Sequence, residues 1–144
     1  MSLQNIWLVA AILDFGAALL HLAIIAGGPS WYRFFGAGEQ MAAMAARGQP
    51  WPAIVTASIA SGLALFGAYA MTVGGFFSQL PWPNTILWGI TGIYGLRAAI
   101  PFLLAPFAVS MRTPFMLWSS AICAAFALAH YGSTMVLTNE WKAP

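Results

Sequence analysis

The sequence predicts an all-α integral membrane protein in which four transmembrane helices form an antiparallel bundle and a short interfacial helix lies in the first loop. Of the 144 residues, 61% are hydrophobic and only 6% are charged, whereas a typical soluble domain is about 25% charged. Four apolar stretches also come close to the ~20 residues that a helix needs to cross a bilayer. We expect them to form one domain over residues 1–144.

The first span is expected over residues 6–26, and the segment Gly27-Gly28-Pro29 follows it directly. Glycine favours the C-terminal cap of a helix, and proline cannot continue one, so this segment predicts the end of the span. The N-terminus carries no Lys or Arg in residues 1–5. The apolar run is also too long for a secretory signal, so we interpret it as a retained membrane span.

The loop after the first span predicts a short helix at about 38–47, which is too short to cross a bilayer. Glu39 near its start and Arg47 near its end match the helix dipole. The aromatic residues at 31–35 suit the headgroup level of a membrane. We therefore expect this helix to lie in the membrane interface.

Three further spans are expected over residues 53–76, 86–108 and 115–137. The third span of the chain contains Arg97, and the fourth contains His130. Short turns that contain proline separate these spans, which is the pattern of antiparallel neighbours.

The distribution of basic residues predicts the orientation. Arg33 and Arg47 lie in the first loop and Arg112 lies in the third, whereas the second loop has no Lys or Arg and the C-terminal tail has only Lys142. The positive-inside rule then places the first and third loops in the cytoplasm. Both termini would lie on the non-cytoplasmic side of a plasma or inner membrane.

Four Asp, Arg or His side chains lie inside the predicted spans, where a charge costs roughly 2.5–3.5 kcal/mol on insertion scales. Counted from the cytoplasmic end of each span at 1.5 Å per residue, His21 is about 9 Å deep, Arg97 about 16 Å, Asp14 about 20 Å and His130 about 24 Å. These depths predict one polar column. We expect Asp14 and Arg97 to pair, either to serve a site or only to fix the helix register.

The residue types suggest roles in a binding or catalytic site. Asp14, His21 and His130 are candidate acids and bases, and Arg97 could hold an anionic or carbonyl group. The remaining candidates for ligand binding are Glu39, Tyr69, Tyr94 and Tyr131. Cys123 is the one cysteine, so neither an intrachain disulfide nor a cysteine-based metal cluster is expected. The cofactor is left open.

These observations favour a membrane protein that binds, and could transform, a lipophilic small molecule such as a quinone, an isoprenoid or a sterol-like lipid. Other classes stay open: an accessory subunit of a larger membrane complex, a pigment- or haem-binding subunit, and a small proton-coupled transporter. A bilayer is the expected surrounding, and a membrane protein partner or a second copy could join it. The net charge of +2 is too small for a nucleic-acid footprint.

Overall fold

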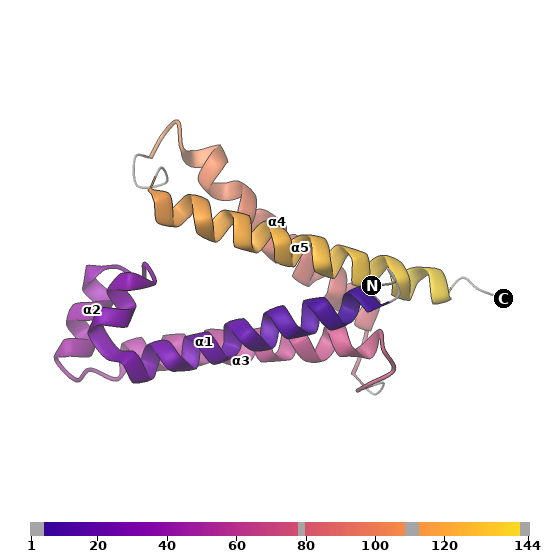
Figure 1. Cartoon of the computed structure of the whole chain (residues 1–144), viewed down its shortest axis with the longest axis horizontal. Helices are drawn as coiled ribbons and strands as arrows, with labels where there is room; N and C mark the ends of the chain where they lie inside the picture. Colours follow the sequence, from indigo (N-terminus) through magenta and orange to yellow (C-terminus); the bar gives the residue numbers. More distant parts are fainter. Residues whose placement is uncertain (1–4, 78–79, 109–112, 142–144) are drawn as a thin grey trace. The chain divides into compact units, whose positions relative to one another are not determined.

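The computed structural model describes residues 5–77, 80–108 and 113–141, of which residues 140 and 141 are described by their backbone alone. Within these ranges the chain is helical and contains no strand (Figure 1). The five helices are α1 (Ile6–Phe34), α2 (Glu39–Ala46), α3 (Trp51–Thr72), α4 (Pro83–Leu104) and α5 (Pro114–Trp141).

Four of these helices, α1, α3, α4 and α5, are long and apolar enough to cross a membrane. The eight-residue α2 is the short helix predicted in the first loop. The predicted fold class of four spans and one short helix is thus confirmed, and the chain is a multi-pass membrane-type helical protein.

The helix α1 is kinked at the predicted end of the first span. Gly28 has φ 67° and ψ −152°, which breaks the helical path, but the chain then resumes a helical course from Pro29 to Phe34. Glycine tolerates a positive φ without steric cost, and proline fits the first turn of a helix because its missing N–H would have no partner there. The regular helix thus breaks within the segment Gly27-Gly28-Pro29, where the end of the span was expected, and the second helical stretch from Pro29 to Phe34 was not predicted.

The other helix ends shift by a few residues. α4 begins at Pro83 instead of residue 86, with Pro in the first turn, and it ends at Leu104 instead of residue 108. α3 begins at Trp51 and ends at Thr72, both earlier than the predicted 53–76. A turn follows its end, closed by a hydrogen bond from the Gly74 N–H to the Met71 carbonyl. α5 continues to Trp141, beyond the predicted end at residue 137.

The chain divides into two compact units. Unit 1 comprises residues 1–13 and 66–144, and unit 2 comprises Asp14–Leu65. The helices α1 and α3 each contribute to both units, whereas α4 and α5 belong to unit 1 and α2 belongs to unit 2. A single domain over the whole chain stays a prediction.

Unit 1 is built on the packing of α4 along α5 (Figure 1). The ring of Tyr94 in α4 lies at its centre, 5.9 Å from the ring of Phe66 and 5.0 Å from that of Phe126. The start of α1 packs on α5 at Gly132, where an added Cβ would lie 3.0 Å from the side chain of Ile6. Small residues at such crossings allow close approach of helices in membranes.

Unit 2 contains the parts of α1 and α3 that run side by side, together with α2 (Figure 1). Its core consists of Ile24, Tyr32 and Ala42. Phe35 and Met41 pack against this core. The segment after the kink thus packs Tyr32 against Ile24, in the earlier part of α1, and against Ala42 of α2.

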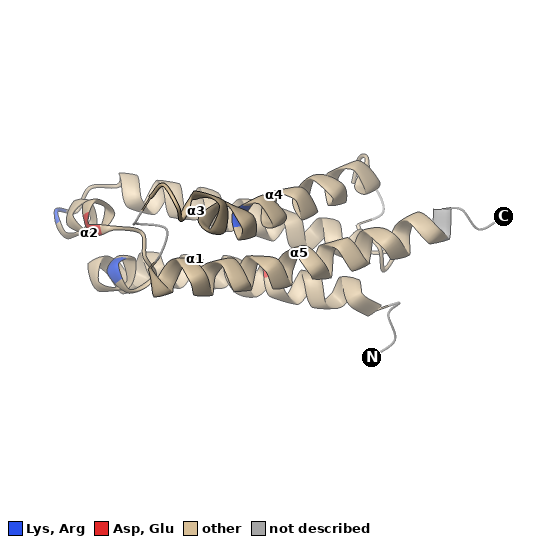
Figure 2. Ribbon diagram, turned by 90° about the horizontal axis from the view of Figure 1, so that it is seen from above, with Lys and Arg blue, Asp and Glu red and all other residues tan. Residues whose placement is uncertain are grey.

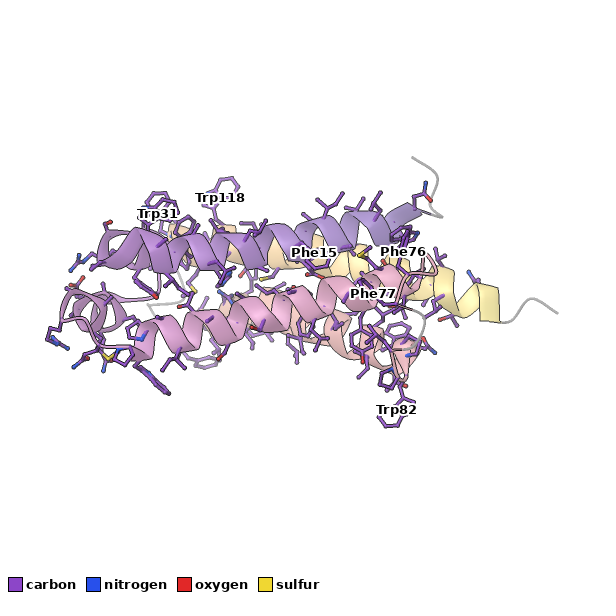
Figure 3. All side chains as sticks on the ribbon, turned by 90° about the horizontal axis from the view of Figure 1, so that it is seen from below. Phe15, Trp31, Phe76, Phe77, Trp82 and Trp118 are labelled. Carbon is purple, nitrogen blue, oxygen red and sulfur yellow. The ribbon has the colours of Figure 1, made fainter. Side chains whose placement is uncertain are left out.

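The outer surface suits contact with lipid. Charged residues are sparse along the helices, and several of them gather around α2 (Figure 2). Large apolar side chains are exposed on all four long helices, and the side chains of Trp82 and Trp118 point away from the helices (Figure 3). Arg112 and Lys142, on which part of the predicted orientation depends, lie outside the described residues, so the sides of the termini stay a prediction.

Candidate functional site

Unit 2 contains a partly open pocket of about 300 Å³, lined by residues of α1, α2, α3 and the turn between α1 and α2. This volume is at the lower end of the range of volumes of small-molecule sites, which bury most of a ligand's surface. Three lining residues carry side-chain polar groups, namely His21, Tyr32 and Thr56. The apolar lining residues are Ile24, Phe35, Ala37, Met41, Val55 and Ile59.

The imidazole of His21 presents one defined nitrogen for contact with a ligand. Its Nδ1 lies 2.8 Å from the backbone carbonyl oxygen of Ala17, one turn earlier in α1. A carbonyl oxygen only accepts hydrogen bonds, so Nδ1 must carry the hydrogen of this bond. In the neutral ring Nε2 is then an acceptor, and this tautomer follows from the hydrogen-bond geometry. Within the described ranges, Nε2 has no hydrogen-bond partner.

Tyr32 lines the same pocket and has a buried hydroxyl. The residue is 2% exposed, and its hydroxyl oxygen has no hydrogen-bond partner among the described residues. A buried hydroxyl without a partner costs free energy, about 1–3 kcal/mol in protein mutational data. Such an unsatisfied buried hydroxyl is rare in native structures, and here it belongs to a residue whose side chain also lines the pocket.

The kink in α1 positions Tyr32. The ring of Trp31 packs directly on Gly27, where a Cβ atom would overlap it. Trp31 also contacts Phe35, with ring centroids 5.7 Å apart. Trp31 is exposed, whereas the neighbouring Tyr32 is buried in the core with Ile24 and Ala42.

Thr56 is the third polar residue of the pocket wall. It is a buried residue of α3, and its hydroxyl has no hydrogen-bond partner among the described residues. A threonine hydroxyl can donate one hydrogen bond and accept others. The pocket therefore combines an apolar wall with three polar groups, which is the usual composition of a small-molecule site.

Glu39, a predicted ligand-binding residue, lies in an exposed ion pair. The guanidinium of Arg33 donates hydrogen bonds of 2.8 and 2.7 Å to the two carboxylate oxygens of Glu39. These hydrogen bonds lower the pKa of the Glu39 carboxyl from its ordinary value. The bidentate pair connects the kinked end of α1 to the first turn of α2.

Asp14 and Arg97 belong to different units, so their pairing stays a prediction. Asp14 is fully buried. Arg97 is partly buried in α4, and its Nη2 donates a 3.0 Å hydrogen bond to Oγ of Ser119 in α5. Ser119 in turn donates to the carbonyl of Met116. The structure thus gives Arg97 a hydroxyl contact within unit 1.

His130 and Tyr94 are brought together in unit 1. Both are buried, and their rings stack with centroids 5.5 Å apart. Tyr69 and Tyr131 lie elsewhere in this unit. The hydroxyl of Tyr69 donates to the carbonyl of Pro81 at 3.3 Å, and Tyr131 is exposed with its ring against that of Trp88.

Of the predicted site residues, His21 is the one that lines the pocket of unit 2. In the described ranges no group of three or more His, Cys, Asp or Glu residues is placed to hold a metal ion. Comparison of the chain with protein-family models, curated proteins and solved structures finds no significant match.

Tyr32 and Thr56 were not predicted as site residues. Thr56 is visible in the sequence as a polar position inside an apolar span, but many such hydroxyls only bond their own helix. Tyr32 lies among aromatic residues that suit a membrane interface. Its burial depends on the chain turning back at Gly28, which spacing alone does not reveal.

Proposed function

We propose that this protein binds a lipophilic small molecule with a polar head, such as a quinone, an isoprenoid or a sterol-like lipid, in the pocket of unit 2. The observation that carries the proposal is Nε2 of His21, which lacks a partner among the described residues and belongs to a side chain in the wall of a largely apolar pocket. An apolar body would satisfy the wall formed by residues such as Val55 and Ile59, and a polar head would satisfy His21.

The hydroxyl of Thr56 supports the same proposal. Two independent polar residues, His21 from α1 and Thr56 from α3, line one cavity. Convergent polar groups in an apolar pocket fix the orientation of a ligand. The catalytic roles of Asp14, His21 and His130 stay predictions, as do the ligand contacts of the other predicted residues.

A pair of substitutions in α3 tests the proposal. Val55 lines the pocket, whereas its neighbour Ile54 is exposed and does not. Val55→Trp should fill the pocket, and Ile54→Trp adds the same bulk outside it. The two variants and the parent protein are purified in lipid nanodiscs, and their organic extracts are compared by mass spectrometry.

A lipophilic compound that is enriched with the parent and with Ile54→Trp, but lost with Val55→Trp, is the expected result. Equal extracts from both variants would contradict binding in this pocket. A visible absorbance band that both variants retain would instead favour the pigment- or haem-binding alternative.

A further inference from the structure

The polar groups of the unit 2 pocket differ in what they can recognise. The hydroxyls of Tyr32 and Thr56 can each donate or accept a hydrogen bond, so they suit a ligand carbonyl and a ligand hydroxyl equally. The Nε2 atom of His21 is different. Since Nδ1 gives its hydrogen to the Ala17 carbonyl, Nε2 of the neutral ring can only accept.

We infer that the pocket prefers a ligand whose head carries a hydroxyl group over one with only a carbonyl group, and that His21 sets this preference. The inference rests on the proposed function, because it assumes that a lipophilic ligand occupies the pocket. The ligand hydroxyl donates its hydrogen to Nε2 of His21, and its oxygen accepts the hydrogen of the Thr56 hydroxyl. A ketone oxygen can accept from Thr56 but leaves Nε2 of His21 without a hydrogen-bond donor.

This assignment narrows the ligand to an alcohol or a phenol, such as an isoprenoid alcohol, a sterol or the reduced form of a quinone. Sites built to hydrogen-bond a hydroxyl reject analogues that lack it, because a buried polar group of the site is then left unpaired. The group left unpaired here would be the half-buried imidazole of His21.

Menthol and menthone provide matched probes, since they share one carbon skeleton and differ in hydroxyl against carbonyl. Their binding is measured by titration calorimetry on the full chain in lipid nanodiscs, with empty nanodiscs as the blank and concentrations corrected for partition into lipid. We expect menthol to bind about fivefold more tightly than menthone, or better, which corresponds to one unpaired buried polar group.

Two variants assign the preference to particular atoms. His21→Phe keeps a ring but removes the acceptor, so it should weaken menthol binding and bring the ratio of the two affinities close to one. Thr56→Val removes a donor that both probes can use, so it should weaken the binding of both probes to a similar degree and leave the preference in place.

The outcomes separate the inference from the proposed function. Equal binding of menthol and menthone to the parent protein would overturn the inference and leave pocket binding intact. A preference that persists in His21→Phe would overturn the role of His21. If that variant does not fold, the comparison of menthol with menthone on the parent protein still tests the inference. Binding of neither probe, together with equal extracts from Val55→Trp and Ile54→Trp, would overturn the proposed function itself.

Discussion

The ring of Tyr94 in α4 stacks on the ring of His130 in α5, with centroids 5.5 Å apart and planes inclined by 23°. The same tyrosine ring lies near Phe66 and Phe126. Aromatic pairs of this kind contribute about 0.5–1.5 kcal/mol beyond the area that they bury. The ring of Tyr94 is therefore a central packing element of unit 1.

Replacement of Tyr94 by alanine should lower the free energy of unfolding by about 3–5 kcal/mol, because it leaves a large cavity among the rings. Tyr131→Ala provides the control, since Tyr131 is exposed and has an edge contact with Trp88, and it should cost about 1 kcal/mol. Unfolding of both variants is followed by steric trapping in bicelles. Similar losses for the two variants would contradict the central role of Tyr94.

Three glycines of α1 should respond differently to alanine. Gly28→Ala places a side chain at a positive φ and should cost about 1–3 kcal/mol. Gly27→Ala should also destabilise the protein, because the new Cβ overlaps the Trp31 ring. Gly16 is helical with no atom within 4 Å of an added Cβ, so Gly16→Ala should stabilise by about 0.5–1 kcal/mol.

Thermal unfolding in detergent ranks these three variants. A Gly28→Ala protein as stable as Gly16→Ala would show that the kink is not required. Loss of menthol binding in Gly27→Ala or Gly28→Ala, with binding retained in Gly16→Ala, would connect the kink to the placement of Tyr32.

The Glu39 carboxyl should titrate below the ordinary pKa of a glutamate, because the Arg33 guanidinium donates hydrogen bonds to its charged form. A carboxyl whose folded pKa lies below its unfolded pKa stabilises the protein above the unfolded value, and this contribution disappears as the pH falls through the folded pKa. Arg33→Gln should return the Glu39 pKa towards its ordinary value. The carboxyl carbon shift of Glu39, measured by NMR against pH, reports both states, and identical curves would rule out the pair.

Two tyrosine hydroxyls should have opposite effects on stability. Tyr32→Phe removes a buried hydroxyl that has no partner among the described residues, so without ligand it should leave the protein as stable or more stable by about 1 kcal/mol. Tyr69→Phe removes the bond to the Pro81 carbonyl and should cost about 0.5–1.5 kcal/mol. The unfolding free energies of the two ligand-free variants test this prediction. A Tyr32→Phe variant that is less stable than Tyr69→Phe would contradict it.

The four spans could be predicted because hydrophobic length is set by the bilayer and does not depend on tertiary packing. Pro29 illustrates where this reasoning stops. Proline ends a helix when it follows one, but it also begins the next helix. Both occur here, because one helical stretch breaks at Gly28 and a second begins at Pro29.

The candidate site could be predicted only in part, for a related reason. His21 is noticeable because an imidazole in an apolar span is unusual. Glu39 has the same chemical interest in the sequence, yet Arg33 lies close enough to neutralise it. Tyr32 enters the pocket through the turn of the backbone at Gly28, and no periodicity in the sequence records that turn.

The bond from His21 to Ala17 lies within one turn of α1, so the backbone of a single helix sets the direction of the imidazole. A side chain held in this way has already lost most of its rotamer entropy before any encounter. An incoming molecule would meet an acceptor that needs no reorientation, so differences in affinity among related ligands would arise in how quickly each one leaves.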